Sequence, residues 1–196
     1  LHLIDDFVIL LNDTNSEKQH ETAWILTNIM STTDPKHVTA VVNAGAVAIL
    51  VDLLQHRSTT DEVREQSAWA LSNIAGDTPD NRDHVLKSGA LSGLLFLLDQ
   101  NPALSLSRVA TWALSNLCRG KPAPPFDLVQ RALPTLSELL LSQDVEVLSD
   151  ACWSVAYLSD GSNEKIQAVI DTANLVPRLL RLLGHRSYAV LKPALR

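Results

Sequence analysis

The stretch SAWALSNIAGD, residues 67–77, places Trp69 and Asn73 four positions apart in a segment of helical composition. Residues at positions i and i+4 share one face of an α-helix, so we expect the indole and the carboxamide side by side. The spacing recurs in TAWILTNIM (22–30) and ATWALSNLCRG (110–120), while ACWSVAYLSDG (151–161) has tyrosine in place of the asparagine. The pair is therefore a property of the whole chain and not of one helix.

Two series of motifs share one period. The tryptophans Trp24, Trp69, Trp112 and Trp153 follow one another at intervals of 45, 43 and 41 residues. Leucine-rich segments recur in parallel, and their final Leu-Leu pairs are spaced by 44, 42 and 43 residues: GAVAILVDLL (45–54), GALSGLLFLL (89–98), RALPTLSELL (131–140) and NLVPRLLRLL (174–183). Two series with one period indicate a structural repeat.

Each repeat is expected to hold three helices. Leucines at helical spacing dominate, and loops rich in glycine, proline and aspartate open the units: STTDP, GDTPD, GKPAPP and SDGSN. A short helix, the leucine-rich helix and the tryptophan helix then follow. Three helices in about 42 residues is the armadillo period, whereas two longer helices would indicate HEAT repeats.

The sequence thus predicts an all-α fold, a right-handed superhelical solenoid of armadillo repeats with one concave face. We expect one domain, 1–196, with units near 31–75, 76–118 and 119–159 and partial units at 1–30 and 160–196. Since the chain begins without Met and ends in KPALR, we expect a piece of about four to five repeats from a longer protein.

The composition narrows the class of ligand. The chain has 196 residues, 46% of them hydrophobic, and a formal net charge of −6, which argues against nucleic acid and favours a basic partner. No segment reaches the length of a membrane span, so no membrane partner is expected. Cys118 and Cys152 match no redox or metal motif, and we expect them reduced and buried in a cytosolic or nuclear protein.

Two interpretations of the Trp–Asn ladder differ in where the side chains point. In one, tryptophan is core and asparagine forms an internal hydrogen-bonding ladder, but every unsatisfied buried amide would cost roughly 1–3 kcal/mol. In the other, which we favour, the pairs line an open groove. Asparagine then binds the N–H and C=O groups of an extended peptide, and tryptophan faces hold the stems of lysine or arginine. Asp77, Glu146 and Asp150 lie near this face and would select positive charge.

Longer motifs carry a resemblance to a known family. The segments VREQSAWALSNIAGD, TWALSNLCRGKPAPPFD and ACWSVAYLSDGSNEKIQAVID resemble importin alpha (karyopherin alpha), the adaptor that binds nuclear localisation signals. The resemblance implies a peptide site formed by the groove residues that match the family's motif: Trp24, Asn28, Gln66, Trp69, Asn73, Asp77, Trp112, Asn116, Glu146, Asp150, Trp153 and Tyr157. Within this set, Asp77 matches the aspartate that pairs with the critical lysine of the signal.

The resemblance also implies partners and location. Cargo proteins bearing nuclear localisation signals would bind the groove, and importin beta would bind the full-length protein through an arm absent here. The protein would act in the cytoplasm and nucleus. Two positions depart from the family's pattern: Thr32 replaces a glycine beside the first ladder pair, and Val109 replaces an asparagine before the third tryptophan.

Other function classes find little support in the sequence. The six histidines have no metal-ligand spacing, and no phosphate-binding loop is present, so we expect no catalytic residues, no metal and no cofactor. An armadillo scaffold for other protein partners is the alternative. Its groove would be basic, which the net acidity and Asp77 argue against.

Overall fold

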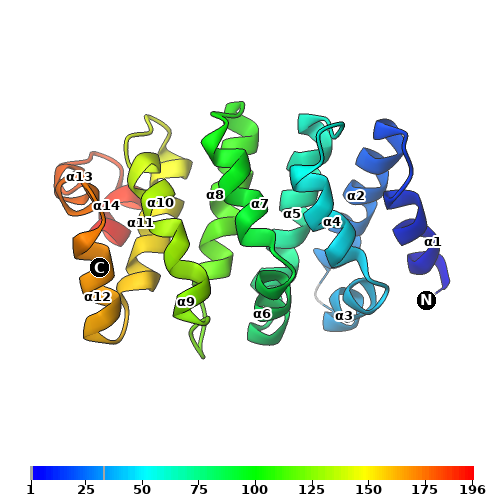
Figure 1. Ribbon diagram of the computed structural model, residues 1–196, viewed down its shortest axis with the longest axis horizontal. Coiled ribbons are helices and arrows are strands. Elements are labelled where there is room, and N and C mark those ends of the chain that lie inside the picture. The colour runs from blue at the N-terminus through cyan, green and yellow to red at the C-terminus, as the bar shows by residue number, and fades with distance from the viewer. Residues whose placement is uncertain (1, 33) are drawn as a thin grey trace.

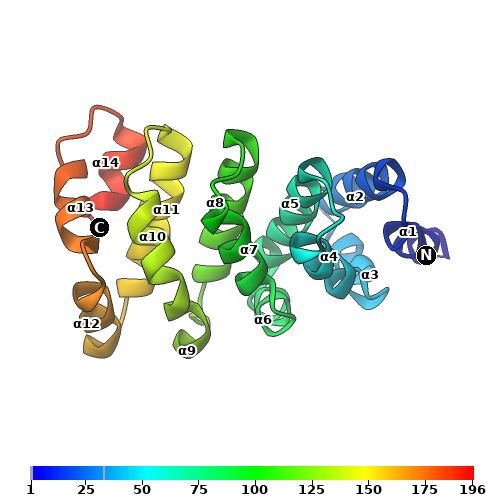
Figure 2. The same ribbon diagram turned by 45° about the horizontal axis from the view of Figure 1, so that its top comes forward.

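The computed structural model describes residues 2–32 and 34–196. Over these ranges it contains fourteen α-helices, one 3-10 helix and no strand. Helical units follow one another in a single row from the N-terminus to the C-terminus (Figure 1). The view turned by 45° shows the same row from a second side (Figure 2). The all-α solenoid expected from the repeats is confirmed.

Three classes of helix alternate along the row. The tryptophan helices pack side by side in chain order: α2 (Ser16–Met30), α5 (Asp61–Asp77), α8 (Leu104–Cys118) and α11 (Val145–Ser159), followed by α14 (Tyr188–Ala194). The leucine-rich helices precede them: α1 (His2–Leu11), α4 (Ala46–Gln55), α7 (Ala90–Asp99), α10 (Leu133–Leu139) and α13 (Leu175–Leu182). The short helices lie along one edge, at the bottom of Figure 1: α3 (Pro35–Asn43), α6 (Pro79–Lys87), α9 (Phe126–Val129) and α12 (Asn163–Asp171).

Local sequence fixes where these helices begin. Side chains at the N-caps accept hydrogen bonds from backbone N–H groups of the first turn in α2, α3, α5, α6 and α11. Gly45 and Gly89 precede α4 and α7 with φ of 85° and 90°, a left-handed conformation that costs glycine little. They turn the chain sharply from the short helix into the leucine-rich helix.

The third unit differs at this turn. Its short helix, α9, has four residues and continues through a 3-10 helix, Gln130–Ala132, into α10. Arg131 stands at the position of Gly45, Gly89 and Asn174, which all have positive φ. A residue with a Cβ other than asparagine or aspartate enters the left-handed region only at a cost. The chain therefore bends through a 3-10 turn in place of the left-handed one.

The core runs continuously through the row. Leu26, Leu71 and Leu114 lie two positions after a ladder tryptophan and are at most 1% exposed. Two residues rotate a helix by about 200°, so these leucines and the tryptophans point in opposite directions. Burying the leucines in the core thus turns the indoles outward.

Both cysteines are free and buried, and burial raises the pKa of each thiol to about 12. They pack as small apolar side chains, in agreement with the expectation of reduced, buried cysteines. In the part of the chain that the structure describes, no single helix is long and apolar enough to cross a membrane. Helices α3 and α4 pass that test only as a pair, bent by 72° at their junction.

Candidate functional site

The tryptophan ladder lies on an accessible surface. Trp24 and Trp69 are 50% and 42% exposed, and Trp112 and Trp153 are partly buried. Buried alanine and leucine positions of the same helices form the core beneath them. An indole that stays about half exposed adds little hydrophobic stabilisation to the folded state. Its exposed face provides an apolar surface for a ligand.

The asparagines are not equivalent. Asn28 is exposed, and Asn73 is partly buried with no hydrogen-bond partner for Nδ2. Asn116 departs from the expectation of an open amide: it is 3% exposed, and its Nδ2 donates to Ser72 Oγ at 2.8 Å and to Ser72 O at 3.2 Å. A Cβ at Gly76 would lie 3.3 Å from Arg119 Nη2 and 3.4 Å from Asn116 Nδ2, so this position leaves little room for a side chain.

A first pocket, here named the Asp77 pocket, has a volume of about 290 Å³. Its lining comes from α2, α3, α5, α8 and the adjoining loops: Met30, Thr32, Pro35, Val38, Ser72, Asn73, Gly76, Asp77, Trp112, Asn116 and Arg119. The exposed carboxylate of Asp77, at the last residue of α5, accepts a hydrogen bond from Asn81 Nδ2 at 2.8 Å. Arg119 Nη2 donates to Gly76 O at 3.2 Å and brings a positive charge to the same pocket.

A second pocket, here named the Asp150 pocket, has a volume of about 430 Å³. It is lined by Trp69, Arg108, Val109, Trp112, Val145, Glu146, Ser149, Asp150 and Ala189. Burial, together with the nearby Glu146 carboxylate, raises the pKa of Asp150 to about 6. Trp112 lines both pockets, and we call the surface that holds these two pockets and the ladder tryptophans the ladder groove. Asp150 and Glu146 thus face Trp69 and Trp112 of the preceding units.

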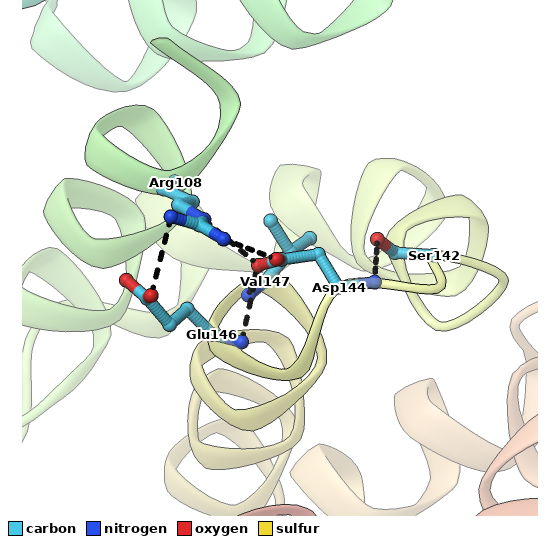
Figure 3. Close-up of polar contacts among 5 residues, drawn as sticks. All are labelled: Arg108, Ser142, Asp144, Glu146 and Val147. Atoms are coloured by element: carbon cyan, nitrogen blue, oxygen red, sulfur yellow. Dashed lines mark hydrogen bonds and ion pairs between the residues drawn. The ribbon is translucent and has the colours of Figure 1, made fainter. Parts of the chain in front are cut away.

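An ion-pair network fixes one wall of the Asp150 pocket (Figure 3). Arg108 on α8 donates from Nε and Nη2 to the carboxylate of Asp144 at 3.1 and 2.6 Å, and its Nη1 lies 3.3 Å from Glu146 Oε1. Asp144 caps α11 by accepting from the backbone N–H groups of Glu146 and Val147, both at 3.1 Å. The hydrogen bond from Arg108 lowers the pKa of Asp144. The network ties α11 to α8 and partly neutralises Glu146, which leaves Asp150 as the acid without an ion pair.

Three polar side-chain atoms on α5 are buried without hydrogen-bond partners: Arg64 Nε, Gln66 Oε1 and Asn73 Nδ2. Gln66 and Asn73, together with Trp69, lie at spacings of three and four residues, so they belong to one stripe of the helix. An acceptor and a donor left unpaired cost roughly 1–3 kcal/mol each. Because both atoms are covered, their side chains must rotate before they can bind the N–H and C=O groups of a peptide.

The fourth pair of the ladder, Trp153 and Tyr157 on α11, has different neighbours from the other three pairs. The rings of Trp153 and Tyr157 stack, with centroids 5.7 Å apart and an interplanar angle of 21°. Lys192 Nζ and Arg196 Cζ each lie 5.8 Å from the Trp153 ring. This pair therefore already has positive charge against its indole.

Seven of the predicted site residues line the two pockets, namely Trp69, Asn73, Asp77, Trp112, Asn116, Glu146 and Asp150, whereas Trp24, Asn28, Gln66, Trp153 and Tyr157 line neither. Sequence reasoning missed four polar lining residues: Ser72, Arg108, Arg119 and Ser149. Helical spacing offered a signal for the arginines, since Arg108 lies four residues before Trp112 and Arg119 seven residues after it. Among the described residues, no cluster of three or more His, Cys, Asp or Glu side chains is arranged to hold a metal ion.

Comparisons with known proteins agree with this architecture. The family model described as "Armadillo/beta-catenin-like repeat" matches residues 34–76, 78–119 and 122–160. Importin subunit alpha-2 of Arabidopsis thaliana is 54% identical over 91% of the chain and 32% of the relative. Importin subunit alpha-1b of Oryza sativa subsp. japonica is 55% identical over 91% of the chain and 33% of the relative. The chain thus spans about a third of the length of these relatives.

Solved structures of designed armadillo proteins share the fold. A designed armadillo repeat protein in complex with the peptide (KR)4 superimposes with a TM-score of 0.87 at 29% identity, covering 99% of this chain and 80% of that one. A computationally designed armadillo repeat protein for modular peptide recognition gives a TM-score of 0.87 at 27% identity, covering 97% and 79%. The chain therefore belongs to the armadillo-repeat family and, within it, groups with the importin alpha proteins.

Proposed function

We propose that the chain binds extended peptides rich in lysine and arginine along the ladder groove, and that these peptides are nuclear localisation signals. The observation that carries the proposal is the combination on α5 of an exposed indole, Trp69, with two unpaired polar atoms, Gln66 Oε1 and Asn73 Nδ2. The indole takes an aliphatic stem and its cation, and the polar atoms take the peptide backbone.

The dimensions of the repeat support an extended ligand. Neighbouring helices pack roughly 8–10 Å apart, and two residues of an extended chain span about 6.6–7 Å. Curvature brings the inner surfaces of adjacent helices closer than their axes, so successive units meet every second peptide residue. Alternate side chains of such a peptide enter the slots between Trp24, Trp69 and Trp112.

Two carboxylates give the ladder groove a preference for positively charged peptide side chains. Asp77 and Asp150 lie in successive pockets separated by Trp112. A lysine or arginine stem packs on the indoles while its charged group meets one of these carboxylates. This arrangement selects positive side chains and reads little else of the peptide's sequence.

The relatives support a role in transport. Their names as importin alpha subunits fit a cargo adaptor for nuclear import, located in the cytoplasm and the nucleus, that joins importin beta in the full-length protein. The designed neighbour bound to (KR)4 shows that a similar solenoid accommodates an alternating basic peptide. On this proposal the chain is a binding module and catalyses no reaction.

A matched pair of aromatic variants tests the proposal. Trp69→Ala removes a 42% exposed indole inside the groove, and Phe96→Ala removes a 44% exposed ring on α7 that lines neither pocket. We expect Trp69→Ala to weaken a lysine-rich peptide by about tenfold or more, measured by isothermal titration calorimetry, with Phe96→Ala unchanged. A charge-reversed peptide should bind neither variant nor the parent. Equal affinity for the basic peptide in parent and Trp69→Ala would disprove the groove assignment.

A further inference from the structure

We propose that Lys192 and Arg196 lie against the indole of Trp153 and prevent a lysine or arginine of the peptide from binding there. We call each Trp–Asn or Trp–Tyr pair a step of the ladder, so this pair, Trp153 and Tyr157, is the fourth step. This inference rests on the proposed function and assigns one of its determinants of specificity. On this basis the groove favours lysine or arginine along Trp24, Trp69 and Trp112, and a neutral or acidic residue at Trp153.

The geometry places two cations on one ring. Lys192 belongs to α14, which packs against α11, the helix that carries Trp153. Lys192 Nζ and Arg196 Cζ are each 5.8 Å from the Trp153 ring centroid, within the range of about 6 Å for a cation–π interaction. Tyr157 stacks against the same indole. The indole therefore has its own cations and a ring neighbour before any ligand arrives.

The other steps lack this arrangement. Within residues 2–32 and 34–196, no lysine or arginine lies over the rings of Trp24, Trp69 or Trp112. Carboxylates line the pockets beside Trp69 and Trp112, namely Asp77, Glu146 and Asp150. The fourth step thus differs from the first three in having cations directly over its indole.

The cations at Trp153 are not neutralised by ion pairs. In the described part of the chain, neither Lys192 nor Arg196 has a carboxylate oxygen within 4.0 Å, and both residues are exposed. Glu146 is engaged by Arg108, and Asp150 faces the pocket of Trp69 and Trp112. Two positive charges therefore act on whatever peptide residue reaches this step.

A peptide lysine gains no binding free energy by displacing Lys192 from the indole of Trp153. It must displace Lys192, which replaces one cation–π contact by another of the same kind, and it then lies beside like charges. A small neutral residue leaves the contacts in place, and a carboxylate meets two cations. The preference at this step is therefore opposite to that at Trp69.

The test compares peptide series on three forms of the chain: the parent, Lys192→Ala and Lys87→Ala. Lys87 is an exposed lysine at the end of α6, so its removal changes the net charge equally but leaves the groove alone. A basic core peptide is extended with Lys, Ala or Glu at each of several flanking positions, and each Kd is measured by fluorescence anisotropy. Urea unfolding of all three forms verifies that they are folded.

The expected result is specific to one flank. At the position that reaches Trp153, Lys192→Ala raises the preference for Lys over Ala by about 2- to 30-fold relative to the parent, and it lowers the preference for Glu. Lys87→Ala leaves both ratios at their parent values. If all three forms show the same ratios at every position, Lys192 does not control the step.

The two proposals fail in different ways. If the basic core peptide binds no form of the chain, or binds without regard to Trp69, the peptide-binding function itself is wrong. If the core peptide binds and depends on Trp69, yet a lysine on the flank strengthens binding to the parent as much as to Lys192→Ala, only the closure of the Trp153 step is wrong.

Discussion

Asn116 Nδ2 donates to Ser72 Oγ at 2.8 Å across the contact between α8 and α5. One unit earlier, the equivalent residue Asn73 has no partner for its Nδ2. The residue equivalent to Ser72 on α2 is Thr27, whose hydroxyl donates to Ala23 O within its own helix at 2.8 Å. Where the preceding helix has Ser72, the Nδ2 atom of Asn116 is hydrogen-bonded to it. Where the preceding helix has Thr27, the Nδ2 atom of Asn73 has no partner.

Two alanine variants at equivalent positions should separate stability from binding. Asn116→Ala removes the bonds to Ser72 and leaves a buried hydroxyl and carbonyl less satisfied, so we expect a loss of about 1–3 kcal/mol in the free energy of unfolding. Asn73→Ala removes an amide that has an unpaired donor, so we expect little change in stability but weaker binding of a basic peptide. Urea unfolding and calorimetric titration measure the two effects. Equal losses of stability in both variants would contradict the distinction.

Charge reversal at Asp77 should abolish binding of a lysine-rich peptide. The carboxylate lies in the Asp77 pocket, and a lysine there would repel the incoming cation at short range. Asp80→Lys, three residues along the chain on α6, makes the same change in net charge outside both pockets and should only reduce the association rate slightly. Surface plasmon resonance at two salt concentrations gives affinities and rates. Similar effects of the two variants would assign selection to the overall charge of the protein.

Stability should depend on pH through Asp150. Its pKa is raised from the ordinary 3.8 to about 6 by burial and by Glu146, so between these values the folded state holds a proton that the unfolded state has released. The stability contributed by Asp150 is therefore fully present below pH 3.8 and is lost as the pH rises through 6. Asp150→Asn should remove this dependence. The measurement is the difference in free energy of unfolding between variant and parent across this window, and a difference independent of pH would refute it.

Binding of a basic peptide should depend on pH in the opposite direction. Only the ionised carboxylate of Asp150 attracts a cation, so peptide affinity should rise as the pH passes 6 in the parent. Asp150→Asn should show a flatter profile. Calorimetric titrations of both forms between about pH 5 and 7, the interval around the shifted pKa, measure the effect. Parallel profiles would place the titrating group elsewhere.

Asp144 combines a helix cap with an ion pair, and two variants should separate the two roles. Asp144→Asn keeps an N-cap side chain but loses the charged pair with Arg108, which should cost up to about 1 kcal/mol. Asp144→Ala also loses the cap, and we expect a further loss of about 0.5–2 kcal/mol. Unfolding by urea measures both values. If Asp144→Asn is as destabilising as Asp144→Ala, the cap contributes little.

Local pattern was enough to predict the repeat and the direction of its tryptophans. The periods of the indoles and of the Leu-Leu pairs follow from contacts within one unit, and the i, i+2 relation between Trp69 and Leu71 fixes which way each side chain points. The short helix of the third unit was less predictable, because the loss of a glycine at Arg131 changes the turn to a 3-10 helix. The division into units at the predicted boundaries stays a prediction.

The sequence by itself determined a helical repeat array with a Trp–Asn stripe and acidic residues near it, because helical periodicity acts over a few residues. Only the tertiary structure decided how each member of that stripe is engaged. Asn116 with Ser72, Arg108 with Asp144 and Lys192 with Trp153 join residues 36 to 44 positions apart in sequence. Such pairs depend on how closely neighbouring helices pack and rotate, and no periodicity within one helix specifies that.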